Sequence, residues 1–209
     1  MSLVELIYDK EEHKKRIKED GLGYPGGVIK TIFKVNGELL GAIVWVEEGK
    51  IEGDECDLYG FFEEMLTLLP YLLSEGKYYR FSKNSQNFNL KEVKSWIDIN
   101  NVKNPNLACW VSLHFQFNIY IFELDKDKDE LIIHYRNDMY LYKDRAGKEG
   151  IVRVPLKDFT KEIVKLAEDY LKLLRNSEIP ENDKDWIKNL EKYLADFKKY
   201  YEERYGEEL

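Results

Sequence analysis

The longest run of alternating apolar and polar positions in the chain lies between Leu107 and Leu124. Every odd position from 107 to 121 is apolar, whereas most even positions carry hydrogen-bonding or aromatic side chains. Successive side chains of an extended strand point to opposite faces, so this pattern predicts one long strand with a core face and a polar, aromatic face. We expect the polar face to be the working surface of the protein.

A second alternating run follows the charged reversal at 125–130 and continues to Lys143, and its apolar odd positions are Leu131, Ile133, Tyr135, Met139 and Leu141. If both strands bury their odd positions on the same side, cross-strand partners pair odd with odd, and the even positions share the other face. That face supplies the candidate binding residues, which are Trp110, His114, Gln116, Asn118, Tyr120, His134, Arg136 and Tyr140.

Nearer the amino terminus, Asn36-Gly37 separates two further apolar stretches, Val28 to Val35 and Glu38 to Val46. A type I′ turn needs positive φ at both central residues, and Asn-Gly meets that need best, so a hairpin is predicted here. Shorter strands are expected at Leu3 to Tyr8, Lys77 to Ser82 and Ile151 to Pro155.

Apolar residues spaced three and four positions apart predict the helices. The main core helix is expected from its N-cap Asp57 through Ser74, with Pro70 kinking it or ending its regular part early. Asp9 is expected to cap a very polar surface helix in which His13 is solvated. A short helix is predicted from Asn89, and two amphipathic helices at 158–175 and 182–205, the last packing its apolar stripe on the domain.

Hairpins followed by grouped helices predict an α+β fold, in which a mainly antiparallel sheet carries helices on one face and ends in a C-terminal amphipathic helix pair. The chain has 209 residues, no internal repeat and no low-complexity linker. This length suits one domain over residues 1–209 with a sizeable core.

The formal net charge of -8 disfavours nucleic acid and anionic membranes as partners and favours a basic protein. Six acidic residues and one lysine lie between Glu47 and Asp57, which predicts either a solvated loop or an acidic docking surface. We find no signal peptide and no apolar run long enough for a membrane helix, so we expect a cytoplasmic protein. Cys56 and Cys109 are expected to be free thiols.

Local catalytic motifs are missing from the sequence. GLGYPGG, at 21–27, matches G-x-G-x-x-G, but it follows a charged helix and not a strand, so we interpret it as a flexible connection. His114 and His134 could join Cys109 at a metal only if all three shared a face, and Cys109 is expected on the core face. We therefore predict no metal and no cofactor, and we favour a role without catalysis.

The alternative is a small-molecule-binding protein or an enzyme that uses the His, Arg and Tyr side chains of the sheet face. The two hypotheses predict different shapes for the surface around the histidines. An enzyme should enclose a pocket around His114 and His134, whereas a binding module should present a flat or convex face with acidic rims.

Four features together give the chain a family resemblance: the Asn36-Gly37 hairpin, the acidic stretch from Glu47 to Asp57, the strand WVSLHFQFNIYIFEL and the helix that VPLKDF opens. In these the chain resembles the small acidic α+β immunity proteins of bacterial toxin systems. The resemblance implies a protein that blocks a partner by binding it, with no catalysis of its own. The sequence leaves the oligomeric state open and is compatible with a homodimer.

Overall fold

The structure is a computed structural model that describes residues 2–77 and 102–209. Most of the predicted strand Lys77 to Ser82 and the whole predicted helix from Asn89 lie outside these residues. The described strands are β1 (Val4–Tyr8), β2 (Val28–Val35), β3 (Glu38–Gly41), β4 (Ile43–Trp45), β5 (Lys50–Glu52), β6 (Asp54–Asp57), β7 (Ala108–Val111), β8 (Asn118–Asp125), β9 (Glu130–Leu141) and β10 (Ala146–Pro155). The described helices are α1 (Lys10–Asp20), α2 (Leu58–Leu73), α4 (Leu156–Arg175) and α5 (Lys184–Tyr205).

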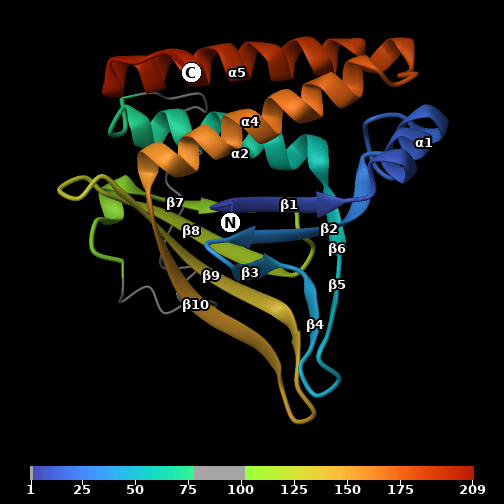
Figure 1. Cartoon of the computed structure of the whole chain (residues 1–209), viewed down its shortest axis with the longest axis horizontal. Helices are drawn as coiled ribbons and strands as arrows, with labels where there is room; N and C mark the ends of the chain where they lie inside the picture. Colours follow the sequence, from blue (N-terminus) through green and yellow to red (C-terminus); the bar gives the residue numbers. More distant parts are fainter. Residues whose placement is uncertain (1, 78–101) are drawn as a thin grey trace.

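The strands form two sheets that the chain itself connects. In the first sheet β1 pairs with one edge of β2, while β3 and β6 follow one another along the other edge. The second sheet has the order β5-β4-β9-β8-β7, with β10 along the remaining edge of β9. The chain leaves the first sheet after β3, forms the β4–β5 hairpin in the second sheet and returns as β6 (Figure 1). Among the described strand pairs only β4 and β9 are parallel.

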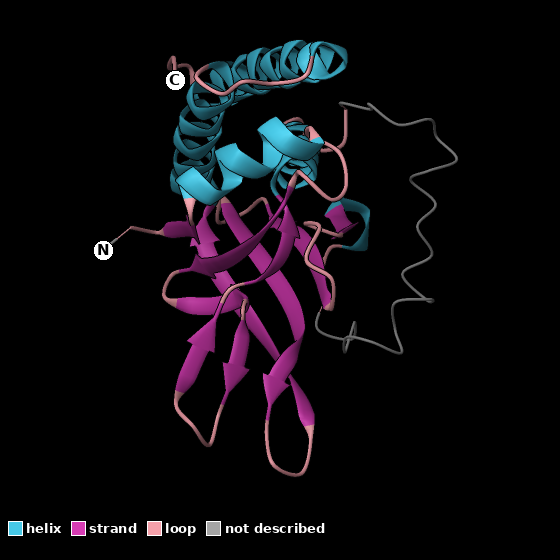
Figure 2. Cartoon of the chain, turned by 90° about the vertical axis from the view of Figure 1, so that its right-hand side faces the viewer, coloured by secondary structure: helices cyan, strands magenta, loops and turns pink. Residues whose placement is uncertain are grey.

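The helices α2, α4 and α5 lie together on one side of the strands, as Figures 1 and 2 show. The helix α2 is the main core helix, with Asp57 capping it by accepting the N–H of Gly60 at 3.2 Å. Pro70 lies inside it, and the helix continues for three more residues to Leu73. The apolar stripe of α5 packs against α2 and α4, which confirms that it packs within the chain. The α+β fold with a mainly antiparallel sheet is therefore confirmed.

Several local predictions are confirmed. Asn36 and Gly37 have φ of 51° and 81° between β2 and β3, as a type I′ hairpin requires. Asp9 caps α1 by accepting the N–H groups of Glu11 and Glu12, each at 3.0 Å. The helix predicted at 158–175 begins two residues earlier, because α4 starts directly after Pro155 and Asp158 lies in its first turn.

The single strand predicted between Leu107 and Leu124 is wrong, because β7 and β8 are the two strands of a hairpin. Residues 112–117 reverse the chain, with Leu113 and His114 in the left-handed region at φ of 48° and 57°. Odd positions face the core in β7, but even positions face it in β8, as the buried pair Val111 and Tyr120 shows. Cross-strand partners between β8 and β9 consequently pair odd with even, and not odd with odd.

His13 is also placed differently from the prediction, which had it solvated. Its side chain is fully buried between α1 and α4, where its Nε2 lies 3.3 Å from the hydroxyl of Tyr170. The ring packs edge-on to Tyr8 and stacks on Tyr170. A single histidine among lysines and glutamates gives no apolar periodicity, so the sequence pattern did not show that it faces the core.

The first prediction concerns Gly41, at the point where the chain leaves the first sheet. A Cβ at this position would lie 2.6 to 2.8 Å from the ring of Phe115, which is itself buried. We expect Gly41→Ala to lower the free energy of unfolding by about 1 to 3 kcal/mol, because the packed ring has little room to move. Gly23→Ala is the control, since its Cβ would make only an ordinary 3.8 Å contact with Trp186. Equal stabilities of the two variants in denaturant titrations would contradict the prediction.

The second prediction concerns the dependence of the free energy of unfolding on pH. Burial, and secondarily the charge of Arg16, lowers the pKa of His13 from 6.5 to about 4. The unfolded chain therefore binds more protons than the folded chain between these values, so this contribution to stability is complete above pH 6.5 and is lost as the pH falls toward 4. The loss should amount to about 3 kcal/mol.

The matched variant is His13→Phe, which keeps a ring between Tyr8 and Tyr170 but cannot take up a proton. Urea titrations at pH 7 and pH 4 should show a smaller pH-dependent loss in this variant than in the wild type. Burial raises the pKa of Asp54 and Asp57, so these two carboxyl groups make the folded state more stable as the pH falls and oppose the effect of His13. The comparison with His13→Phe separates the two effects. An identical loss in both proteins would show that His13 does not cause it.

Candidate functional site

The eight candidate residues do not share one face. The cross-strand partners place Asn118 and Tyr120 on the inner face of the second sheet, and Trp110, His134 and Arg136 on its outer face. His114 and Gln116 lie in the turn between β7 and β8. Tyr140 belongs to a separate apolar cluster near the end of β9. The face that the sequence pattern predicted is thus divided among four places.

Asn118 and Tyr120 point into the protein and join the two sheets. The Tyr120 hydroxyl donates to the carbonyl of Leu40 at 2.8 Å, and Asn118 Nδ2 donates to the same carbonyl at 3.3 Å. Both side chains are buried, and burial raises the pKa of Tyr120 well above its usual value. These two side chains stabilise the contact between the sheets and are not accessible to a binding partner.

His134 forms a buried pair with Glu123, and neither side chain is more than 1% exposed. His134 Nε2 lies 2.8 Å from Glu123 Oε2, while Glu123 Oε1 accepts the backbone N–H groups of Lys103 and Asn104, each at 2.7 Å. The carboxylate therefore anchors residues 103–104 to the outer face of the second sheet. The sequence pattern does not single out Glu123, because this residue lies within an apolar run at a position expected to face the core.

His114 is the accessible histidine, with a side chain 37% exposed. Its Nδ1 lies 3.9 Å from Asp57 and its Nε2 lies 4.0 Å from Glu64, distances too long for hydrogen bonds. The ring lies directly against Gly60 in the first turn of α2, where a Cβ would be only 2.5 Å away. His114 is thus positioned by packing, and burial raises the pKa of its neighbour Asp57.

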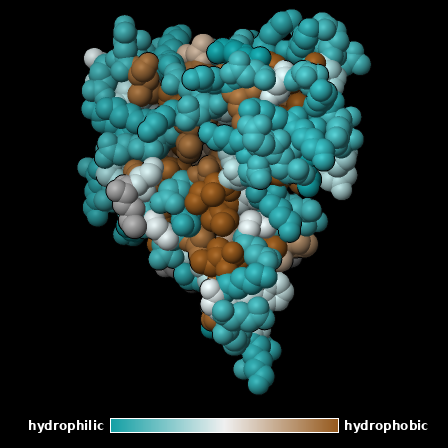
Figure 3. Space-filling view, turned by 45° about the vertical axis from the view of Figure 1, so that its right-hand side comes forward, coloured by the Kyte–Doolittle hydropathy of each residue, from teal (hydrophilic) through white to brown (hydrophobic). Residues whose placement is uncertain are grey.

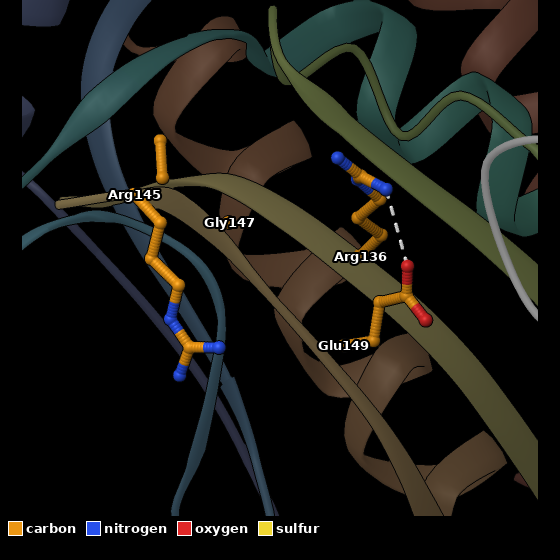
Figure 4. Close-up of a pocket in the computed structure, with 5 residues that line it drawn as sticks. Arg136, Arg145, Gly147 and Glu149 are labelled. Atoms are coloured by element: carbon orange, nitrogen blue, oxygen red, sulfur yellow. Dashed lines mark hydrogen bonds and ion pairs between the residues drawn. The ribbon is translucent and has the colours of Figure 1, made fainter. Parts of the chain in front are cut away.

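Arg136 lines an open pocket of about 290 Å³ together with Arg145, Ala146, Gly147 and Glu149. Arg136 donates to Asp138 at 2.6 Å and to Glu149 at 3.1 Å, the second contact being the dashed line in Figure 4. The side chain of Arg145 points in a different direction (Figure 4), and its guanidinium lies over the ring of Tyr142. The two arginines therefore do not converge on a common point where an anion could bind.

The acidic stretch from Glu47 to Asp57 is a solvated loop only at the β4–β5 turn, where Glu47 and Glu48 are exposed. It forms the β4–β5 turn and the strands β5 and β6. Asp54 is buried, Asp57 caps α2, and Glu52 pairs with Lys50 at 2.5 Å. Asp54, Asp57 and Glu52 are thus engaged in three separate contacts of the fold.

The described part of the chain does present one continuous apolar surface, which we call the apolar band. Ile7 lies beside its partner Ile32, and Val44 lies beside both Ile51 and Tyr140. These two groups meet in one cluster. The members of the apolar band are Ile7, Ile32, Leu39, Ala42, Val44, Ile51, Tyr140 and Tyr142. Figure 3 shows apolar side chains in a band that runs from the helices toward the tapering end of the molecule.

The apolar band combines a buried base with exposed members. Ala42 and Val44 are buried, whereas Ile7 and Ile51 are each 48% exposed. Ion pairs border it, with Lys34 at 3.5 Å from Glu5 and Lys148 at 3.0 Å from Glu38. The hydrogen bond from Lys148 lowers the pKa of Glu38. Of the predicted residues only Tyr140 belongs to the band, because the prediction took the binding residues from the alternating pattern at 107–143 and most members of the band lie before it.

The chain matches no family model, and no curated protein or solved structure is significantly similar to it. Within residues 2–77 and 102–209 no group of three or more His, Cys, Asp or Glu side chains is arranged to hold a metal ion. In the same ranges no helix is long and apolar enough to cross a membrane. Cys56 and Cys109 are both free thiols, as the sequence predicted.

The third prediction compares the two sheet histidines. We expect His134→Ala to lower the free energy of unfolding by about 3 to 5 kcal/mol, because Glu123 Oε2 would stay buried without its contact to His134 and the lost ring would leave a cavity. His114→Ala should cost no more than about 1 kcal/mol, since that side chain is partly exposed and its ion contacts are long. Denaturant titrations of both variants test this, and the reverse order of stabilities would refute the assignment of roles.

Proposed function

We propose that this protein is a protein-binding module without catalysis of its own, and that the apolar band is its docking surface. The observation that carries the proposal is the combination of two half-exposed isoleucines, Ile7 and Ile51, with a continuous apolar cluster between them. Contiguous exposed apolar surface rimmed by polar groups is typical of protein–protein interaction sites.

The placement of the candidate catalytic groups favours binding over the enzymatic alternative. His134 is buried with Glu123, while His114 lies at the start of α2, so the two histidines do not line a common pocket. Arg136 is already engaged by Asp138 and Glu149. A reaction centre needs converging, accessible groups, and these residues do not provide one.

The proposed partner is a basic protein with an apolar patch of its own. The net charge of -8 favours a basic partner through long-range attraction, while the apolar band supplies the short-range contact. The resemblance to immunity proteins suggests one form of this role, in which the band covers the working surface of a toxin. The paired charges Glu5–Lys34 and Glu38–Lys148 would form the polar rim of the interface.

The fourth prediction tests the apolar band directly. The double variant Ile7→Asp, Ile51→Asp places two carboxylates on the band, and it should lose its partner because burying an unpaired charge is costly. Phe117→Asp is the matched control, since Phe117 is also 48% exposed but does not belong to the band. Affinity capture from a lysate of the source cells, with all three proteins at equal loading, provides the comparison.

The proposal requires that the wild type and Phe117→Asp retain the same protein, that the band variant does not, and that the purified pair forms a complex in titration calorimetry. We expect the dissociation constant to rise at least about a hundredfold in the band variant. Equal capture by all three proteins would refute the band as the docking surface. Thermal unfolding of each variant checks that the loss is not caused by misfolding.

A further inference from the structure

The strand β10 leaves a long edge of the second sheet without a strand partner in the described part of the chain. It pairs with β9 along one edge only, from Ala146 to Pro155. The other edge strands are much shorter, with five residues in β1, three in β5 and four each in β3, β6 and β7. Every residue of a strand has backbone hydrogen-bonding groups, so a free edge of this length is a template for another strand.

The exposed side chains along β10 form a self-complementary pattern, so two copies of the strand can pair with each other. Glu149, Ile151 and Arg153 alternate along one face and are all exposed, with Ile151 at 45%. Their partners on β9 are Arg136, His134 and Ile132, which places them on the outer face of the sheet. Two opposite charges thus stand at equal distances on either side of an exposed isoleucine.

We propose that two copies of this chain associate through β10, with the strands antiparallel and a two-fold axis at Ile151. In this register Ile151 lies opposite Ile151 of the second copy, and Glu149 lies opposite Arg153 of the second copy on both sides of the axis. Opposite charges directly across an antiparallel pair attract, and the two isoleucines cover each other.

The ends of β10 limit the pairing and select this register. A register irregularity lies between Ala146 and Lys148, and Pro155 has no N–H to donate, so the regular edge extends from Lys148 to Val154. The centre of that segment is Ile151. An axis at Gly150 or Val152 places Glu149 and Arg153 opposite Ile151 or opposite a residue beyond the regular edge. An axis at either charged residue places it opposite the same charge of the second copy.

The test uses two single variants that should each fail to dimerise but should dimerise with one another. Glu149→Arg places arginine opposite arginine at both sites, and Arg153→Glu places glutamate opposite glutamate. In an equimolar mixture each arginine of the first variant meets a glutamate of the second. Analytical ultracentrifugation over a concentration series measures all three samples and the wild type.

We expect each single variant to raise the dimer dissociation constant about tenfold or more, and the mixture to return to within about threefold of the wild type. Each substitution also breaks a contact within its own chain, either Glu149 with Arg136 or Arg153 with Glu130. These losses are the same in the mixed and the separate samples, so they cannot explain recovery of the dimer in the mixture. A mixture that stays monomeric while the wild type dimerises would refute this register. A wild type that is monomeric at every concentration would refute the dimer.

A second measurement locates the axis independently. Ile151→Cys should form a disulfide-linked dimer under mild oxidation, because residue 151 faces itself in the proposed register. Ile7→Cys is the control, with similar exposure on a different edge strand. The native thiols will not interfere, since Cys56 is buried and burial raises the pKa of Cys109 to about 12. Equal cross-linking of both variants would contradict the proposal.

Discussion

The fold depends on how the chain crosses from one sheet to the other at Leu40 to Ala42. Leu40 and Ala42 are fully buried, and neither has a ladder partner, since the β2–β3 register skips Leu40 and ends at Gly41 and the β4–β5 register begins at Ile43. A buried carbonyl without a partner costs free energy comparable to a lost hydrogen bond. Three side chains of the second sheet meet this need: Tyr120 and Asn118 donate to Leu40, and Asn137 donates to Ala42 at 2.9 Å. The crossing thereby ties the two sheets together and directs the β4–β5 hairpin away from the first sheet.

This requirement explains why the polar residues of β8 were mistaken for a working surface. An alternating pattern shows which positions share a face, but it does not show which face is exposed when both faces are buried. The outer face of β8 is covered at Ile121, and the inner face carries Asn118 and Tyr120 because the crossing needs donors. Alternation also continued without interruption through residues 112–117, where neither glycine nor proline marks the reversal. Ser112, whose hydroxyl accepts the N–H of His114, was the one local turn signal.

The elements that the sequence predicted well are those whose signal is local. The Asn36-Gly37 turn, the Asp9 and Asp57 caps and the apolar periodicity of α2 and α5 depend on residues within a few positions of one another. The burial of His13, the Glu123–His134 pair and the apolar band depend on contacts between distant segments. In the band, Ile7 comes from β1 of the first sheet and Tyr140 from β9 of the second sheet, and the crossing at Ala42 brings their neighbours into one cluster. Such contacts between distant segments cannot be predicted from any short stretch of the sequence.

The proposed dimer and the proposed docking surface are connected by the geometry of β10. A two-fold axis between antiparallel edge strands stands perpendicular to the joined sheet, so the same face of each copy lies on the same side. Lys148 of β10 lies 5.0 Å from the ring of Tyr140, which places one end of the apolar band next to the proposed interface. Two bands would then face one side of the assembly. A partner with two binding sites at a matching separation would bind such a dimer more tightly than a single band allows, because the second contact forms at a high effective concentration.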